Sequence, residues 1–186
     1  MTSMTAPFTL SVEPTASAPA LLLRPWQDTD IETIVKAYRD DAMRRWLMGS
    51  VDGEHEARAW LARWETGWAD DTRLSWAIEE EHEVVGHFVV KAAEPPETLA
   101  TGVGYWTLAQ ARGRGIASRC VEAVTQWLFS SQVIMPADEV ELLHKVGNQA
   151  SCRVAEKSGY PLDSILPAMP PRFLHEGHRH LRRCPV

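Results

Sequence analysis

The sequence is poor in the residue types that mark disulfide-bonded, membrane-spanning or secreted proteins. It has three cysteines among 186 residues, Cys120, Cys152 and Cys184, and no C-x-x-C spacing. An odd number of unclustered cysteines excludes a disulfide framework and indicates reduced thiols in the cytoplasm. No apolar run approaches the ~18 residues of a membrane-spanning helix, and no basic stretch followed by an apolar one marks a secretory signal. We therefore expect a cytoplasmic protein without a membrane partner.

Positive charge is also scarce. The chain has 19 lysines and arginines against 25 aspartates and glutamates, a net charge of −6 at pH 7. This balance excludes a nucleic acid as the main partner, because a basic surface supplies most of the affinity for one. Two phosphate-binding motifs are absent as well, the G-x-x-x-x-G-K-[ST] of a P-loop and the G-x-G-x-x-G of a dinucleotide fold.

What remains is the composition of an ordinary globular domain. Hydrophobic residues make up 45% of the chain and charged residues 24%, which suits one compact domain. Residues 1–19, rich in Thr, Ser, Ala and Pro, predict a flexible leader, and residues 20–186 predict a single domain. Hydrophobic periodicity predicts strands at 21–24, 74–78, 84–91, 101–108, 140–146 and 172–183, and helices at 31–40, 54–68, 113–130 and 148–157. This order predicts a mixed sheet flanked by helices, an α/β (α+β) fold.

The junction between the fourth strand and the third helix has the pattern of an anion site. It reads Arg112-Gly113-Arg114-Gly115-Ile116-Ala117, a segment that we call the glycine loop. The first N–H groups of a helix lack internal partners, and the helix dipole is positive there. The two glycines allow a phosphate close to those amides, and the two arginines add positive charge. By itself the pattern fits a diphosphate site and an ordinary surface turn about equally well.

Longer segments carry a resemblance to a known family. Gly104-Tyr105-Trp106-Thr107-Leu108 and the glycine loop resemble the fourth strand and acetyl-CoA loop of the GNAT acetyltransferase superfamily. The family pattern [QR]-x-x-G-x-[GA] is met by Arg112, Gly115 and Ala117.

Residues 148–160 are similar to the N-x-x-S-x-x-[VL]-x-E-K-x-G-[FY] segment of one GNAT branch, which contains the ribosomal-protein N-terminal acetyltransferases. The opening Leu22-Leu23-Arg24-Pro25-Trp26 and the closing His178-Arg179-His180 are similar to that branch too, so the resemblance spans residues 20–183.

The resemblance implies both a fold and a reaction. The fold is the GNAT fold, a mixed, mostly antiparallel sheet of about six or seven strands with four helices and a splayed cleft between the fourth and fifth strands. The reaction is acetyl transfer from acetyl-CoA to a primary amine by direct attack in a ternary complex. The acceptor is a protein N-terminal α-amine or a small-molecule amine such as an antibiotic, a polyamine or an amino acid. The resemblance also allows a homodimer.

The same resemblance assigns residues to the cofactor. Backbone groups of the strand would bind pantetheine, and amides of the loop would hold the diphosphate. The implied cofactor-binding residues are Trp106, Thr107, Leu108, Arg112, Gly113, Arg114, Gly115, Ile116, Ala117, Ser118, Asn148 and Ser151.

The catalytic residues are less completely defined. Ser151 is the candidate acid that protonates the departing thiolate, and its alternative is an ordinary helix-start hydrogen bond with Asn148. No base is assigned, because Gly102 stands where relatives often carry Glu, and Ala155 replaces a frequent Tyr. These two departures leave open a CoA-binding module that has lost turnover. Structural roles are expected for Glu83, His87 and His144.

Two further groups of residues are expected to be structural. Trp46, Trp60, Trp64 and Tyr160 fit core positions better than an acceptor pocket. His175, His178 and His180 invite a metal interpretation, since the last two share one strand face. No cysteine or carboxylate lies at a convincing spacing from them, so we expect no metal site and only acetyl-CoA as co-substrate.

Overall fold

The structure, a computed structural model, describes residues 6–47, 49–95, 100–131, 137–171 and 173–185. These residues form eight strands, five α-helices and two short 3-10 helices. The chain divides into two compact units, one of residues 1–90 and 105–116 and the other of residues 91–104 and 117–186. Strand β5 (Thr101–Thr107) contributes residues to both units.

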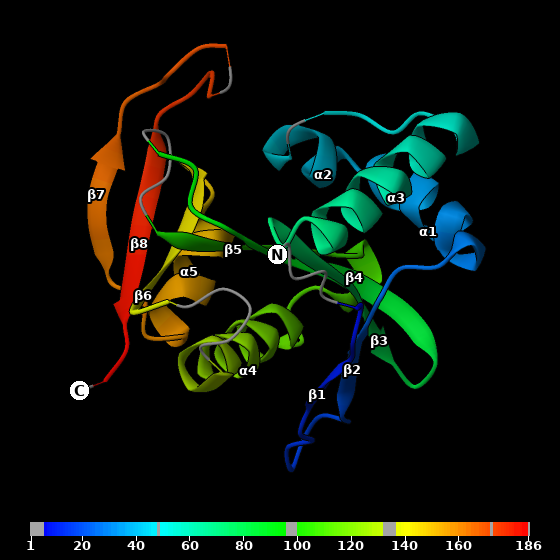
Figure 1. The fold of residues 1–186 in the computed structure, drawn as a ribbon, viewed down its shortest axis with the longest axis horizontal. Coiled ribbons are helices and arrows are strands. Elements are labelled where there is room, and N and C mark those ends of the chain that lie inside the picture. The colour runs from blue at the N-terminus through cyan, green and yellow to red at the C-terminus, as the bar shows by residue number, and fades with distance from the viewer. Residues whose placement is uncertain (1–5, 48, 96–99, 132–136, 172, 186) are drawn as a thin grey trace. The chain divides into compact units, whose positions relative to one another are not determined.

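The first unit contains the N-terminal strands and three helices (Figure 1). Its elements are β1 (Leu10–Val12), β2 (Leu21–Arg24), η1 (Asp28–Asp30), α1 (Ile31–Tyr38), α2 (Asp41–Trp46), α3 (Glu54–Ala69), β3 (Arg73–Glu80), β4 (Glu83–Lys91) and η2 (Ala109–Ala111). The strand order is β1-β2-β3-β4-β5, and β2 runs antiparallel to both β1 and β3. A two-residue turn with positive φ at Glu81 and His82 joins β3 to β4, as a tight hairpin requires.

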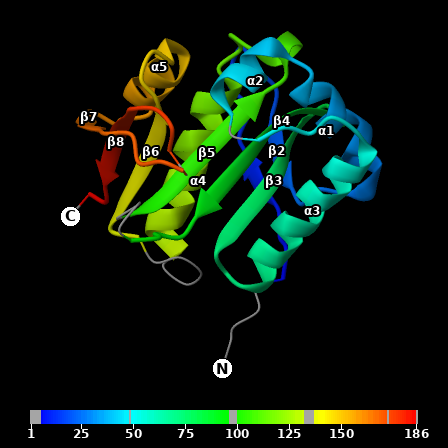
Figure 2. The same ribbon diagram turned by 90° about the horizontal axis from the view of Figure 1, so that it is seen from above.

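Helix α3 buries the face that its sequence predicts. The apolar residues at three- and four-residue spacing are buried: Ala57, Trp60, Leu61, Trp64 and Trp68. Helices α1 and α3 lie side by side (Figure 2), and Ile34 and Tyr38 join Trp60 and Trp64 in one core cluster. The core role expected for Trp60 and Trp64 is therefore confirmed.

Part of the expected flexible leader is ordered. Residues 10–12 form β1, which pairs with β2, and Val12 is buried. The Phe8 ring contacts Trp68 and Trp76 edge-on, with ring centroids 5.3 and 5.7 Å apart, and the Phe8 carbonyl accepts a hydrogen bond from Trp76 Nε1. Few apolar residues are enough to order this segment because they pair with an existing sheet edge and pack on a pair of tryptophans.

The second unit contains α4 (Ile116–Ser131), β6 (Glu139–Lys145), α5 (Gln149–Lys157), β7 (Leu162–Leu166) and β8 (Gly177–Arg183). Its strands follow the order β5-β6-β8-β7 (green, yellow, red and orange in Figure 1). Strand β5 pairs parallel with β6 over three residue pairs, Thr101–Val103 with Val140–Leu142. Strand β8 is antiparallel to both β6 and β7.

The predicted mixed, mostly antiparallel sheet is thus confirmed, with more elements than expected. Strand β7 was not predicted because it is a short element with little burial, in which Leu162 and Ile165 are exposed. Helix α2 has six residues, too few to show a period. The last strand begins at Gly177 rather than 172, and Arg172 lies outside the described residues.

Buried residues of α4 and a residue that follows α5 pack in the core. Helix α4 begins at Ile116, and its stripe of Ile116, Cys120, Val124 and Leu128 is buried. Tyr160 is buried as predicted, and its hydroxyl lies 2.6 Å from Thr125 Oγ1.

Among the described residues, no helix is both long enough and apolar enough to cross a membrane.

Candidate functional site

The glycine loop has the backbone conformation that an anion site needs. Strand β5 ends at Thr107, η2 follows, and the loop then leads into α4. Gly113 and Gly115 have φ of +75° and +76°, a left-handed conformation that other residues rarely adopt. No atom lies within 4 Å of a Cβ added at either glycine, so the space in front of the loop is open. The loop can thus present its backbone amides to a ligand.

The two arginines of the loop, which the sequence suggested would add positive charge, form ion pairs with acidic residues. Arg112 Nη2 lies 2.6 Å from Asp40 Oδ1, and Arg114 pairs with Glu80. Asp40 also caps α2 by accepting a hydrogen bond from the Met43 N–H at 3.1 Å. The Arg112 guanidinium holds the pKa of Asp40 below its usual value. The charge of both arginines is therefore already balanced.

A cavity of about 260 Å³ lies beside the loop, within the first unit. Its apolar wall comes from Ala37, Met43 and Leu108, and its polar rim includes Lys36, Arg39, Asp40 and Arg112. Ligand pockets for drug-sized molecules usually measure about 300–1,000 Å³, so this cavity fits only part of a large cofactor. Sequence reasoning did not single out Lys36, Arg39 or Asp40, because α1 and the two residues after it show only a generic amphipathic pattern.

The end of β5 only partly fits its expected role. The Leu108 N–H donates to the Val85 carbonyl at 2.9 Å, and the Leu108 carbonyl accepts from the Ala111 N–H. The Leu108 N–H is therefore already paired with β4, and the expected binding of pantetheine by backbone groups of residues 106–108 stays a prediction. Trp106 is buried against Ala37, Met43 and Leu108. Its indole N–H has no hydrogen-bond partner among the described residues.

An aromatic group surrounds His87 on β4. Its ring centroid lies 5.2–5.9 Å from those of Trp26, Trp60, Trp64 and Trp106. The Trp26 indole N–H donates to His87 Nδ1 at 3.0 Å. His87 is 3% exposed and sits inside this tryptophan cluster, which agrees with the structural role expected for it.

In the second unit, Asn148 and Ser151 lie at the start of α5. The Asn148 side chain accepts the Ser151 N–H at 3.3 Å and so caps the helix. No hydrogen bond to Ser151 Oγ is found in the part of the chain that the structure describes. The cap uses the Ser151 backbone and leaves its hydroxyl for another partner. Ala117 and Ser118 form the start of α4, where the Ser118 carbonyl accepts from Ser158 Oγ.

Glu141 on β6 is a buried carboxylate that sequence reasoning missed. It is 1% exposed and stands opposite Gly102 in the β5–β6 register. A Cβ added at Gly102 would lie 3.8 Å from Glu141 Cγ, so Glu141 lies beside the position at which the resemblance leads one to expect a Glu. Arg179 Nε donates to Glu141 Oε2 at 2.8 Å, and Oε1 has no partner among the described residues. Burial raises the pKa of Glu141, and the Arg179 guanidinium opposes that rise.

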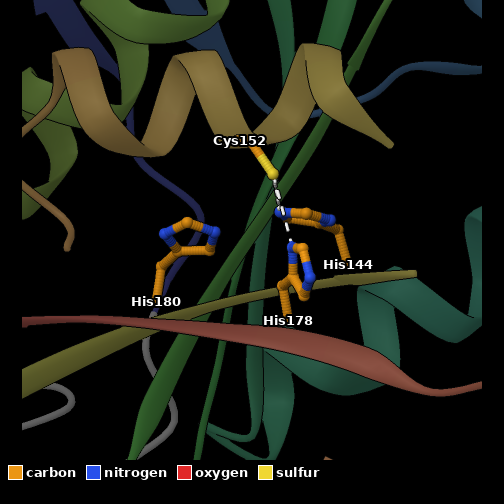
Figure 3. A group of neighbouring side chains, drawn as sticks. All are labelled: His144, Cys152, His178 and His180. Atoms are coloured by element: carbon orange, nitrogen blue, oxygen red, sulfur yellow. Dashed lines mark hydrogen bonds between the residues drawn. The ribbon is translucent and has the colours of Figure 1, made fainter. Parts of the chain in front are cut away.

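Three histidines and a cysteine form a cluster in the second unit (Figure 3). His144 comes from β6, Cys152 from α5, and His178 and His180 from β8. Cys152 Sγ lies 3.6 Å from His144 Nε2 and 3.4 Å from His178 Nδ1. Burial lowers the pKa of His144. His175 is not part of this group.

Comparisons with known proteins identify the family of the chain. The family model described as an acetyltransferase (GNAT) domain matches residues 20–161. No curated protein sequence matches the chain.

Solved acetyltransferase structures share the fold. RimL, a ribosomal α-N-protein acetyltransferase in complex with coenzyme A, is similar with a TM-score of 0.76 and 18% identity, over 94% of this chain and 98% of that one. RimJ of Mycobacterium smegmatis, in complex with CoA-disulfide, has a TM-score of 0.74 and 15% identity, over 98% and 88% of the two chains. The microcin self-immunity acetyltransferase MccE, in complex with acetyl-CoA and AMP, has a TM-score of 0.74 and 12% identity, over 88% and 92%.

Structural likeness at these identities establishes the fold, and the family match extends over most of the chain. The protein belongs to the GNAT acetyltransferase family and is an acetyl-CoA-dependent N-acetyltransferase.

Proposed function

We propose that this acetyltransferase moves the acetyl group from acetyl-CoA to the α-amine of a polypeptide N-terminus. The choice of acceptor is supported by the segment that begins with Asn148 and Ser151, which resembles the ribosomal-protein branch of the family. RimL and RimJ, which share the fold, add support. The amine attacks the thioester directly while both substrates are bound, so no covalent enzyme intermediate forms.

The observation that carries the cofactor assignment is the left-handed backbone at Gly113 and Gly115, directly before α4. We assign the backbone of residues 112–118 to the diphosphate, since the N-terminus of a helix carries a positive dipole that favours an anion. Arg112 is 37% exposed, and an ion pair at this exposure contributes only about 0–1 kcal/mol. A phosphate can therefore draw Arg112 away from Asp40 at small cost.

Ser151 is our candidate for the proton donor. The departing CoA thiolate must gain a proton, and a hydroxyl can donate a hydrogen bond to it. The support is that the helix cap occupies the Ser151 backbone N–H and not the hydroxyl.

Glu141 is our candidate for the base that takes a proton from the attacking ammonium. It stands next to Gly102, where relatives carry a carboxylate, and one of its oxygens has no partner among the described residues. A carboxylate whose pKa is raised by burial is a stronger base than an exposed one. The proton transfers thus use a hydroxyl and a carboxylate, and we assign no metal to the reaction.

We place the reaction in the cytoplasm. All three cysteines of the chain are free thiols, as expected in a reducing compartment.

The test has two parts, binding and turnover. Acetyl-CoA binding is measured by calorimetry, and free-thiol release is followed with unblocked N-terminal peptides. The matched control is the same peptide with its N-terminus acetylated, which leaves only lysine side chains as acceptors. Binding with release that requires the free N-terminus supports the proposal.

Each of three other outcomes would overturn one part of the proposed function: the acceptor, the turnover or the cofactor site. Release only with small amines, such as polyamines, amino acids or aminoglycosides, would assign a small-molecule acceptor instead. Binding without release in the presence of any amine would identify a CoA-binding module, and absence of binding would refute the cofactor site.

A further inference from the structure

We propose that His144, Cys152, His178 and His180 form a tetrahedral site for one Zn²⁺ ion. The site goes beyond the acetyl-transfer reaction and uses none of the residues assigned to it. The inference differs from the sequence-based expectation of no metal, which rested on the lack of a cysteine near the histidines. The fold supplies that cysteine, because α5 places Cys152 over the strands that carry the histidines (Figure 3).

The register of the sheet brings the three histidines together. In the β6–β8 pairing, His144 stands directly opposite His178, and His180 lies two residues further along β8 on the same face. The four ligand atoms, one from each side chain, all lie within 4.8 Å of one another.

Two of the distances between the four ligand atoms match the edges of a zinc tetrahedron. Zn–N bonds of about 2.0–2.1 Å and Zn–S bonds of about 2.3 Å give an N···S edge of about 3.6 Å and an N···N edge of about 3.4 Å. The separations of Cys152 Sγ from His144 Nε2 and His178 Nδ1 are 3.6 and 3.4 Å. The other ligand atoms lie within 4.8 Å of one another, so an ion would draw these side chains closer together.

The hydrogen bonds of the histidines leave the correct nitrogens available. His144 Nδ1 lies 3.0 Å from the Lys145 carbonyl, and His180 Nδ1 lies 3.0 Å from the Tyr160 carbonyl. A carbonyl only accepts, so both Nδ1 atoms carry the proton and both Nε2 atoms keep a lone pair. Backbone carbonyls commonly orient metal-binding histidines in this way.

His180 supplies a second, independent indication of a ligand. The side chain is 2% exposed, and Nε2 is buried without a hydrogen-bond partner among the described residues. A buried acceptor without a partner is costly, and a metal ion would satisfy it. The other three residues are partly exposed, which gives the ion a route of entry.

The donor set favours zinc over other common ions. Neutral imidazoles with a thiolate suit Zn²⁺, whereas Mg²⁺ and Ca²⁺ prefer oxygen ligands. Four protein ligands fill the tetrahedron, which is typical of a structural site rather than a catalytic one. The ion would join β6, α5 and β8, and so hold the first turn of α5, which carries Asn148 and Ser151.

The test uses the full chain, stripped of metal with a chelator under reducing conditions and titrated with Co²⁺. We expect a near-ultraviolet sulfur-to-cobalt charge-transfer band that saturates at one Co²⁺ per chain and disappears on addition of Zn²⁺. Zinc at a hundredfold excess over its Kd should raise the thermal unfolding midpoint by about 5–10 °C. No acetyl-CoA or amine is present, so this result is independent of the transferase assay.

Two substitutions remove one ligand each while keeping the local contacts. Cys152→Ser replaces the thiolate, and His180→Asn keeps a donor for the Tyr160 carbonyl but removes Nε2. Both should abolish the charge-transfer band or weaken Co²⁺ binding at least tenfold, whereas the controls Cys184→Ser and His175→Asn should match the unsubstituted chain. Circular dichroism of the metal-free variants checks their folding. Absence of one-to-one binding to the unsubstituted chain, or an unchanged band in Cys152→Ser, would overturn the proposal.

Discussion

The glycine loop of the first unit and strand β6 of the second unit serve function in opposite ways. The loop is a continuous, exposed segment whose arginines are neutralised by Asp40 and Glu80, and its proposed function rests on backbone amides. The proposed functions of strand β6 rest on side chains, with Glu141 on one face and His144 on the other. Each of these depends on partners from other elements, Arg179 for Glu141 and the cluster residues for His144.

This difference between backbone and side-chain sites indicates which amino-acid substitutions each region tolerates. A site built from backbone should be sensitive to φ and to strand spacing, and less sensitive to the identity of its charged side chains. A site built from side chains should be sensitive to single conservative replacements. Four substitutions test this contrast.

The largest expected effect is a loss of catalytic activity on substitution of Glu141 in β6. Glu141→Gln keeps the shape of the side chain but removes the base, so kcat/KM should fall about a hundredfold. In the unsubstituted enzyme kcat/KM should fall as pH drops through the pKa of Glu141, which burial raises, because the protonated acid cannot accept a proton. The variant should lose this limb of the pH profile. Glu139→Gln, on the same strand face, is the control, and an unchanged profile in the Glu141 variant would exclude the base.

The next effect concerns the spacing of strands beside the loop. A Cβ at Gly86 would lie 2.5 Å from the Trp106 carbonyl oxygen and 3.3 Å from Thr107 Cα. Gly86→Ala should therefore lower the free energy of unfolding by about 2–3 kcal/mol, as overpacking does. Gly102→Ala meets no atom closer than 3.8 Å and should be nearly neutral. Equal unfolding midpoints in urea for the two variants would contradict the close contact.

Strain within the loop should weaken cofactor binding directly. Gly115→Val cannot keep φ near +76°, a conformation that costs other residues about 1–2 kcal/mol. The loop should relax and its amides diverge, so the Kd of acetyl-CoA in calorimetry should rise about tenfold. Gly49→Val introduces the same strain at φ +87° outside the loop and should leave the Kd unchanged. A normal Kd for Gly115→Val would show that the loop amides do not bind the cofactor.

The smallest expected effect is a change in acetyl-CoA affinity that comes from the charge of Arg112 and not from the loop backbone. Asp40→Asn keeps a cap for α2, since Asn is as good an N-cap as Asp, but removes the charge that holds Arg112. The freed guanidinium should tighten acetyl-CoA binding about two- to fivefold, the range expected of an exposed ion pair. Asp41→Asn, the exposed neighbour, is the control. Weaker binding in the Asp40 variant would mean that the ion pair itself shapes the loop.

The sequence predicted the loop well because its information is local. Two glycines between a strand and a helix specify both the conformation and the position of the amides. The ion pairs of Arg112 and Arg114 were not predicted, since Asp40 and Glu80 are distant in sequence and are brought near by the fold. The hydrogen bond from Leu108 to Val85 was missed for the same reason.

The His–Cys cluster and Glu141 could not be predicted from spacing. His178 and His180 stood out as a strand pair, but Cys152 precedes His178 by 26 residues and reaches it only through α5. The position of Glu141 beside Gly102 depends on the parallel register of β5 and β6. Pairing across elements is decided by tertiary packing, which hydrophobic periods do not specify.

The odd separation of Glu141 and His144 along β6 constrains how this strand can diverge in length. A single-residue insertion or deletion between them would turn both side chains toward the same face of the sheet. The group on the shifted side would then lose its surroundings, and every other residue on that side of the change would turn to the opposite face with it. Homologous chains that keep both groups should therefore tolerate changes of length in the segments before β6 and after it, but not within these four positions.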